Sequence, residues 1–212
     1  MLRFFSEKNT NYLLLAMHLA GFLGLLIPFT RDFFKILVPF NLLSNFALLI
    51  YFHKEKKTIF WVLLVWIMLV GFWVEYIGVE TGFIFGNYWY KTTLGYKFLG
   101  IPLMIAINWF IVIYSSSAVV APTSLLKWQK AILASFLAVF LDYWIEPVAI
   151  RLDFWDWQGG VVPLQNYLGW FVTALFLQIP FQYSSFEKKN KVASMLYFYE
   201  LVFFMLLAIF LA

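Results

Sequence analysis

The sequence has no cysteine, few histidines and little charge. Without cysteine, its 212 residues cannot form a disulfide, present a thiolate nucleophile or ligate an iron–sulfur cluster. The two histidines, His18 and His53, are too few for histidine-ligated iron chemistry, and we expect no metal site. Only 12% of the residues are charged, whereas a soluble domain carries about 25%. The composition therefore argues against a soluble domain.

Apolar residues dominate instead, at 64% of the chain, and aromatic residues reach 23%. This balance is typical of an integral membrane protein. The net charge of +4 does not indicate nucleic-acid binding, because the lysines lie in short clusters between apolar runs, as in loops that flank membrane spans. The opening MLRFFSEKNT is too charged and too short for a complete signal sequence, so we expect the apolar run after it to be the first span.

Seven stretches approach the length of about 20 apolar residues that crosses a bilayer. They are approximately Tyr12 to Phe29, Phe33 to Phe52, Thr58 to Gly78, Pro102 to Val120, Ala131 to Ala149, Leu164 to Phe181 and Val192 to Leu211. Continuous runs of this length favour helices over barrel strands, which alternate and are about 10 residues long. We therefore predict an all-α, polytopic transmembrane helix bundle of about seven spans, forming a single integral-membrane domain over residues 1–212.

Lysine and arginine are divided unequally between the two ends of this predicted bundle. Ten of the 15 fall on the side that holds the N-terminus. The positive-inside rule then places the N-terminus in the cytoplasm of a multi-pass protein of the cell membrane. The last predicted span contains no lysine to hold retinal as a Schiff base, which argues against a seven-helix retinal protein.

Four acids, Glu75, Glu80, Asp142 and Glu146, lie inside spans or near their ends. An acidic side chain at the centre of a span costs roughly 2.5–3.5 kcal/mol, so each of them needs a reason to be there. Asp142 and Glu146 are four residues apart and share one helix face. Two facing carboxyls in a low dielectric tend to share a proton, which could leave one of them as a standing acid at neutral pH.

A structural role is the alternative interpretation of these acids. Glu75 or Glu146 could pair with Arg151 or Lys91 near the membrane interface. Glu200 stands alone in the last span with no evident partner, and a helix-packing hydrogen bond is favoured for it over catalysis.

Aromatic residues cluster between the acids. Membrane proteins place tryptophan and tyrosine in interfacial belts by default, but one group is interleaved with acids and glycines: Tyr88, Trp89, Tyr90, Trp144, Trp155 and Trp157. The face of such a ring stabilises a cation by roughly 1–2 kcal/mol when desolvated, so this group could line a chamber for a carbocation. Asn108 interrupts the fourth span, and its amide could orient a water or a carboxyl.

Glycines recur every four residues in GVETGFIFGNYWY, at Gly78, Gly82 and Gly86. On a continuous helix they would form a small-residue stripe for close helix contact, whereas an irregular turn lining a cavity is the alternative. Glu80 lies about 140° around a helix from Glu75 at 100° per residue. Both acids can face one site only if the backbone breaks between them, and we expect that break at Gly78.

Three stretches match the pattern of a known family: VEYIGVETGFIFGNYWYKTTLGYKFLGIPLMIAINW, LDYWIEPVAIRLDFWDW and VPLQNYLGWF. In this order they resemble the membrane carotenoid-biosynthesis proteins, which include carotenoid 1,2-hydratases and bisanhydrobacterioruberin hydratases. The resemblance spans about residues 74 to 171. Position by position, the family motifs fall on Glu75, Gly78, Thr81, Gly82, Phe85, Gly86, Tyr88, Pro102, Trp109, Asp142, Glu146, Pro147, Arg151, Trp155, Trp157, Pro163, Asn166 and Trp170.

The resemblance implies a hydratase that adds water to the terminal double bond of a linear, lycopene-like carotenoid. An acid protonates the second carbon of the end group, and water captures the tertiary cation left at the first. This chemistry requires no oxygen, flavin, metal or nicotinamide, so no cofactor is expected. We predict Glu75 or Asp142 as the proton donor, with Glu146 and Glu80 tuning it or activating water.

Further residues are predicted to bind substrate or support the acids: Thr81, Phe85, Tyr88, Asn108, Trp109, Trp144, Arg151, Trp155, Trp157, Asn166 and Trp170. Two other functions stay open, namely a lycopene-cyclase-type enzyme that uses the same protonation step and a non-enzymatic carotenoid-binding or transport protein. The expected partners are the linear carotenoid and the lipid bilayer, with no nucleic acid. Association with other carotenoid enzymes is one further expectation.

Overall fold

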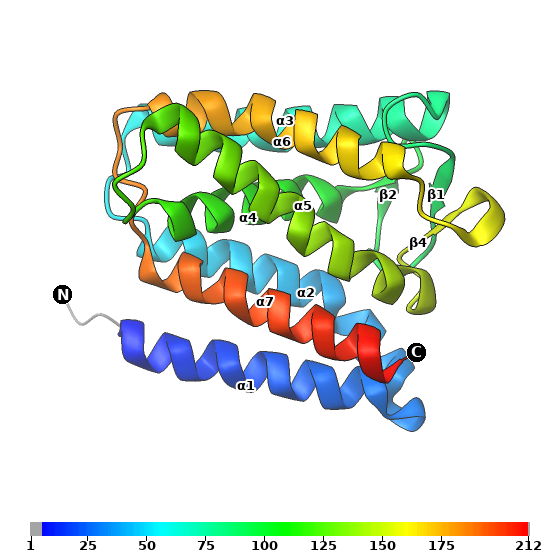
Figure 1. Ribbon diagram of the computed structural model, residues 1–212. Coiled ribbons are helices and arrows are strands. Elements are labelled where there is room, and N and C mark those ends of the chain that lie inside the picture. Colours follow the sequence, from blue (N-terminus) through cyan, green and yellow to red (C-terminus); the bar gives the residue numbers. More distant parts are fainter. Residues whose placement is uncertain (1–5, 212) are drawn as a thin grey trace.

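The computed structural model describes residues 6–211, most of which are α-helical (Figure 1). Seven helices lie within these residues: α1 (Glu7–Leu26), α2 (Pro28–Phe52), α3 (Thr58–Thr81), α4 (Leu103–Val120), α5 (Lys127–Arg151), α6 (Leu164–Tyr183) and α7 (Lys191–Phe210). The all-α prediction is confirmed. The predicted cytoplasmic segment that carries Arg3 lies outside the described residues.

Six helices in the described part of the chain are long and apolar enough to cross a membrane, judged by length and composition. The seventh, α6, carries the buried polar side chains Asn166, Gln178 and Gln182, which lower its hydropathy. These side chains face protein rather than lipid, since Gln178 Nε2 donates to the carbonyl of Ile113 at 2.8 Å. The helix predicted over residues 164–181 is therefore confirmed, and its crossing of the membrane stays a prediction.

The helices lie side by side and run roughly along one direction (Figure 1). In this view α1 lies at one edge, α2 and α7 come next, α4 and α5 follow, and α3 and α6 form the opposite edge. Helix α4 is central, because 78% of its most apolar 18 residues are buried, against 17% of the corresponding window in α2. A helix apolar on all sides can be buried in this way, whereas α2 presents much of its apolar surface outward.

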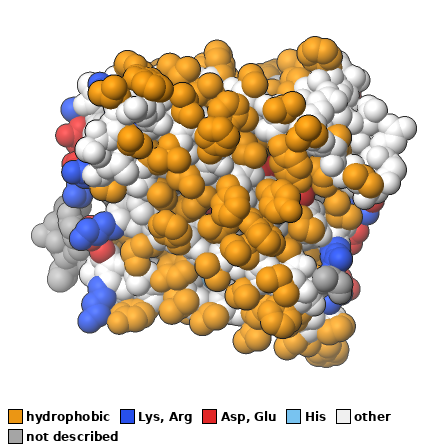
Figure 2. Space-filling model, in the orientation of Figure 1, with side chains coloured by type: hydrophobic (Ala, Val, Ile, Leu, Met, Phe, Trp, Pro, Cys, Tyr) orange, Lys and Arg blue, Asp and Glu red, His pale blue; other side chains and the backbone are white. Residues whose placement is uncertain are grey.

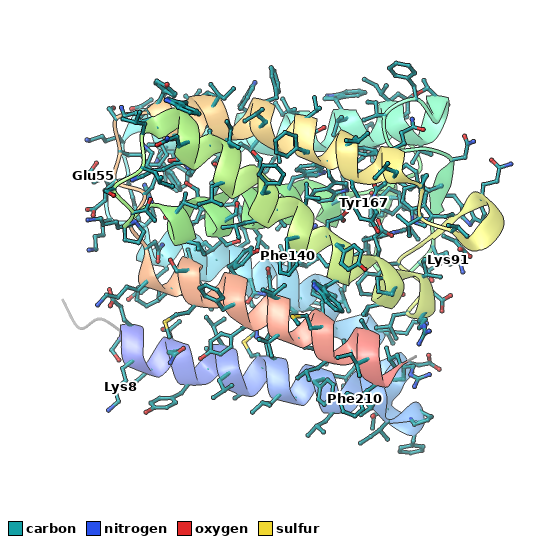
Figure 3. The ribbon with its side chains drawn as sticks, viewed as in Figure 1. Lys8, Glu55, Lys91, Phe140, Tyr167 and Phe210 are labelled. Carbon is teal, nitrogen blue, oxygen red and sulfur yellow. The ribbon has the colours of Figure 1, made fainter. Side chains whose placement is uncertain are left out.

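Hydrophobic side chains cover the middle of the molecule, and charged side chains gather at its two ends (Figure 2). Many large apolar side chains on this surface are exposed, among them Phe29 at 96% and Leu168 at 60%. A soluble protein rarely exposes a patch of this extent. Glu55 lies at one charged end and Lys91 at the other (Figure 3). The surface is that of a multi-pass membrane protein, and its cytoplasmic side stays a prediction.

Short strands lie at the end of the bundle that holds Lys91 (Figure 1). They are β1 (Tyr88–Tyr90), β2 (Lys97–Phe98), β3 (Ile101–Pro102) and β4 (Trp155–Trp157), with a 3₁₀ turn at Gln158–Gly160. β2 pairs with β3, and β1 pairs with β4 in antiparallel fashion, with Tyr88 opposite Trp157 and Tyr90 opposite Trp155. Because side chains alternate along a strand, these four rings are buried while Trp89 faces outward.

Helix α3 continues through Gly78, so the expected break at that residue is wrong. The helix ends at Thr81, and the next residue, Gly82, adopts the left-handed conformation with a φ of 64°. Gly78 has a packing role instead, because a Cβ there would lie 2.7 Å from the ring of Phe85. The predicted glycine stripe thus admits a side chain of the following loop, and does not join two helices along one face.

Candidate active site

Glu75 lies in the last two turns of α3, where it accepts three hydrogen bonds. Its Oε2 accepts from the hydroxyls of Tyr88 at 2.5 Å and Tyr90 at 2.7 Å. Its Oε1 accepts from the indole Nε1 of Trp109 at 2.9 Å. The residue is only 3% exposed. A buried carboxyl therefore depends on neutral donors from β1 and α4 to replace its hydration.

Glycine and aromatic stacking bring Trp109 to this carboxyl. Gly71 lies one turn before Glu75 on the same face of α3, and a Cβ at Gly71 would lie 2.6 Å from the Cβ of Trp109. On its other side, the Trp109 ring stacks on Trp170 of α6, with ring centroids 4.1 Å apart and planes at 16°. The indole is held between α3 and α6 with its N–H toward Glu75.

The two tyrosines of β1 remain donors over the whole ordinary pH range. Their burial, and next the negative charge of Glu75, raise the pKa of Tyr88 and Tyr90 well above the usual value. A neutral phenol keeps its proton available for the carboxylate. The β1 strand therefore delivers two fixed dipoles to one oxygen of Glu75.

Two further buried acids, Asp142 and Glu146, lie four residues apart on one face of α5. Glu146 Oε2 accepts from the indole Nε1 atoms of Trp155 at 2.9 Å and Trp157 at 2.8 Å. The amide Nδ2 of Asn166 donates to Glu146 Oε1 at 3.0 Å and to Asp142 Oδ2 at 3.1 Å. Asn166 thus bridges the two acids, and both acids are at most 2% exposed.

The pairing of β1 with β4 brings Glu75 of α3 close to the two acids of α5. The tyrosines of β1 hold Glu75, the tryptophans of β4 hold Glu146, and the rings of Tyr88 and Trp157 lie 5.0 Å apart between centroids. Asn166 links Asp142 to Glu146, and the contact between Tyr88 and Trp157 links Glu146 to Glu75. We call the three acids the carboxyl cluster.

No basic side chain in the described part of the chain pairs with the carboxyl cluster. Lys91 contacts Asp153 at 3.4 Å and Asp156 at 3.0 Å, at the outside of the strands. Arg151 is exposed. The alternative in which Glu75 or Glu146 pairs with Lys91 or Arg151 is therefore wrong.

Asp142 differs from the two glutamates in having a free oxygen. Its Oδ1 is buried and has no hydrogen-bond partner among the described residues. The indole N–H groups that contact Glu146 can only donate, so Glu146 is built to accept as an anion. A proton shared within the α5 pair would therefore lie on Asp142, because its Oδ1 has no donor directed at it.

A comparison with known proteins identifies the family. The model of a family described as "Carotenoid biosynthesis protein" matches residues 36–212, which include the whole carboxyl cluster. This chain belongs to the carotenoid biosynthesis protein family. The resemblance noted in the sequence is thereby confirmed.

One protein similar to this chain has a named activity. A protein of Haloarcula japonica named bisanhydrobacterioruberin hydratase is 30% identical over 121 residues, which are 52% of this chain and 40% of that protein. The chain thus matches less than half the length of this curated relative. No solved structure matches the chain.

Within this family fold, the structure brings together most of the predicted site residues. Glu75, Asp142 and Glu146 form the cluster, and the others contact them or stack on a contacting ring: Tyr88, Trp109, Trp155, Trp157, Asn166 and Trp170. The predicted grouping of acids and rings around residues 75 and 142–157 is present. The catalytic and binding roles of these residues stay predictions.

Other predicted residues lie apart from the cluster. Glu80 and Thr81 are exposed at the end of α3, where the Thr81 hydroxyl donates to the carbonyl of Ile77 at 2.6 Å. Because α3 does not break at Gly78, Glu80 keeps its angular separation from Glu75 and faces away. Phe85 differs from these two residues, because its ring packs edge-on against Tyr88 with centroids 6.1 Å apart; it is 1% exposed and fills the space beside Gly78.

Trp144 and Asn108, which are also predicted to lie in the site, are not among the residues that hold the three acids. Trp144 is partly buried, and its Nε1 has no hydrogen-bond partner within residues 6–211. Asn108 lines a cavity on the far side of α4 and α5 from the cluster, together with Trp155. Neither residue hydrogen-bonds to the three acids.

One contact to Glu75 is absent from the predicted site. Tyr90 donates to Glu75 Oε2, yet the sequence places it only within a general aromatic group. The signal that identifies it is the alternation in YWY and WDW, in which the first and third rings share one strand face. Reading those triplets as strands would have selected Tyr90 and left out Trp89.

Proposed function

We propose that this protein is a carotenoid hydratase that adds water to the terminal double bond of a linear, lycopene-like end group. The observation that carries the proposal is the carboxyl cluster: three buried acids held by neutral donors, with one oxygen of Asp142 left free. The name of the Haloarcula japonica relative supports the same reaction type. The family supports the broader role in carotenoid biosynthesis.

In this proposal Asp142 is the general acid. It transfers its proton to the second carbon of the end group, and the π electrons of the double bond form the new C–H bond. The first carbon becomes a tertiary cation. Water attacks this carbon, and the proton that the water loses goes to the carboxylate of Asp142, which restores the general acid. The net change is the addition of one water, so the reaction requires no oxidant, reductant or cofactor.

Glu75 and Glu146 act as fixed negative charges in this scheme. Indole and phenol donors already point at their oxygens, so they need not reorganise as positive charge develops nearby. The faces of Trp155 and Trp157 add an electron-rich wall, which stabilises a desolvated cation by roughly 1–2 kcal/mol per ring. We further propose that the chain works as one integral domain of the cell membrane with its N-terminus in the cytoplasm. Association with other carotenoid enzymes stays a prediction.

Expression in a lycopene-accumulating host tests the proposal. The wild-type protein should yield a pigment heavier by one water, and Asp142→Asn should lower this product roughly 100-fold or more, as expected for loss of a general acid. Asp32→Asn is the matched control, because the Asp32 side chain is 94% exposed at the start of α2 and contacts Lys35, not the carboxyl cluster. Full hydration by the folded Asp142→Asn variant would remove Asp142 from the mechanism.

The mass of the pigment also separates the two rival functions. A cyclase would use the same protonation step, but an internal double bond would capture the cation, so the product would have the mass of the substrate. A binding or transport protein would leave the pigment unaltered in every variant. Either result, with the protein present and folded, would reject the hydratase proposal.

A further inference from the structure

A cavity of about 370 Å³ lies on the other side of α4 and α5 from the carboxyl cluster. Its lining comes from α1, α2, α4, α5 and α7, and from the loops that hold Leu94 and Phe154. Most of the lining side chains are apolar, such as Leu42, Phe203 and Phe204. A cavity of this size and character suits part of a long hydrocarbon ligand.

Glu200 of α7 faces this apolar cavity. It is 7% exposed, and none of its contacts within the described residues is a hydrogen bond or an ion pair. An isolated buried carboxyl is costly unless a partner satisfies it. The helix-packing hydrogen bond expected for Glu200 from the sequence is not formed. The cavity therefore combines an apolar wall with one carboxyl that lacks a partner in the protein.

The cavity opens toward the apolar surface of the molecule. Three of its lining residues, Ala20 of α1 and Phe40 and Ser44 of α2, are exposed. At the strand end, Lys35 of α2 contacts Asp153 at 2.6 Å, between the lining residues Leu152 and Phe154. The ion pair ties the strand end to α2, and the exposed lining residues lie on α1 and α2, so we infer that a ligand dissolved in lipid enters beside these two helices.

Trp155 is common to the cavity and the carboxyl cluster. The residue lines the cavity, and its Nε1 donates to Glu146 at 2.9 Å. Ile145 also lines the cavity, directly before Glu146 in α5. A ligand in the cavity would thus be separated from the acids by one indole ring.

We propose that this cavity binds the isoprenoid chain of the carotenoid, and that Glu200 hydrogen-bonds to the hydroxyl of the hydrated end group once that end group has left the acids. The identity of the ligand rests on the proposed function. The apolar wall suits the isoprenoid chain, and the exposed lining residues allow entry from lipid. The carboxyl of Glu200, which has no partner among the described residues, can accept a hydrogen bond from one hydroxyl of the ligand. Glu200 is a binding residue here and does not donate the proton in hydration.

We call the cavity, taken as a binding site for the carotenoid chain, the chamber. Pigment binding to the purified protein in lipid nanodiscs tests it. Leu42→Trp fills the cavity, whereas Leu43→Trp adds the same ring on the exposed face of α2, one residue away. Retention of lycopene, measured by absorbance per protein, should fall at least fivefold in Leu42→Trp and stay at the wild-type level in Leu43→Trp. Equal retention by the two variants would overturn the chamber.

A second pair of variants tests Glu200. The wild type should bind singly hydrated lycopene roughly 3–10-fold more tightly than lycopene, the range for one net hydrogen bond. Glu200→Leu should abolish this preference and keep lycopene binding, and Glu200→Gln should keep most of the preference. An unchanged preference in Glu200→Leu would overturn the assignment, as would loss of hydration with normal binding in Glu200→Gln.

These measurements distinguish failure of the proposed binding cavity from failure of the proposed hydratase function. If Leu42→Trp loses pigment retention but the wild type makes no hydrated product, the chamber stands and the hydratase proposal fails. If Asp142→Asn loses hydration while Leu42→Trp retains pigment and activity, the hydratase stands and the chamber fails.

Discussion

The carboxyl cluster and the cavity lie on either side of Trp155, and their polar groups are held in opposite ways. Glu75 and Glu146 each accept three hydrogen bonds from neutral donors. Glu200, in the cavity, accepts none within the described residues and lines a wall in which most side chains are apolar. Both regions contain buried acids, but only in the carboxyl cluster do hydroxyl, indole and amide groups of the described residues donate hydrogen bonds to them.

This difference separates chemistry from binding. Oriented donors in a low dielectric stabilise charge without reorganising, which is what a reaction through a cation requires. An apolar cavity that opens toward lipid provides affinity for hydrocarbon, and an unpaired carboxyl in its wall provides selectivity for a ligand oxygen. Changes on the cluster side should therefore lower turnover with little effect on pigment retention. Changes in the cavity should lower pigment retention first, and turnover should fall only because less substrate is bound.

The largest expected effect in this comparison comes from Trp157→Phe. The change removes one of two indole donors to Glu146 while keeping a ring in place. Loss of a hydrogen bond to a buried charged group is worth about 1.5–3 kcal/mol, so turnover should fall roughly 10–100-fold with pigment retention unchanged. Product formation in membranes and bound pigment are the two measurements.

The control for this variant is Trp89→Phe. Trp89 lies on the paired strand β1, faces outward and is 48% exposed. Its replacement should leave turnover within twofold of the wild type. Comparable losses in the two variants would show that the strand pair supports only folding, and would break the distinction between the two regions.

A medium effect is expected for Gly78→Ala. The added methyl would lie 2.7 Å from the Phe85 ring and 3.1 Å from the Tyr88 hydroxyl. Overpacking of this kind destabilises a protein by about 1–3 kcal/mol, and displacement of Tyr88 would weaken its bond to Glu75. The unfolding temperature in detergent and the turnover should both fall, and lycopene retention should not.

The matched control is Ile77→Ala, at the preceding, outward-facing position of α3. It should change the unfolding temperature less than Gly78→Ala does. If pigment retention fell in Gly78→Ala as much as turnover, the cluster and the cavity would be one mechanical unit.

The smallest effect is expected from the Lys35–Asp153 ion pair. The Lys35 ammonium, and then Lys91, lower the pKa of the Asp153 carboxyl from its usual 3.8. The stabilisation is therefore fully present above pH 3.8 and is lost as the pH falls through the lowered value. Asp153→Asn should destabilise the protein by less than about 1 kcal/mol at neutral pH.

Thermal unfolding at neutral and acidic pH measures this contribution. The difference between wild type and Asp153→Asn should vanish once the pH is below the lowered pKa. Asparagine is a suitable replacement because Asp153 has a φ of 59°, a left-handed conformation that asparagine also tolerates. A difference that persists unchanged in acid would show that the ion pair does not stabilise the strand end of the cavity.

The sequence by itself determined the class of protein and most of its helices. Continuous apolar runs of sufficient length dictate transmembrane helices, because only helices and closed barrels pair all backbone polar groups in a bilayer and barrel strands are shorter and alternate. The spacing of Asp142 and Glu146 likewise determined that they share a face, since helix geometry is local. The resemblance to the family followed from motifs between about residues 74 and 171.

Only the tertiary structure decided which acids meet. Glu75 and Glu146 come together because β1 pairs with β4, and no periodicity within either segment specifies that long-range pairing. Glu80 faces away because α3 stays helical through Gly78, where the space left by the missing side chain is filled by Phe85 rather than by a bend. The cavity around Glu200 depends on side chains from five helices, and its volume is set by how those helices pack. Local sequence dictates local geometry, whereas the register and rotation of distant segments are decided by contacts that form only in the folded bundle.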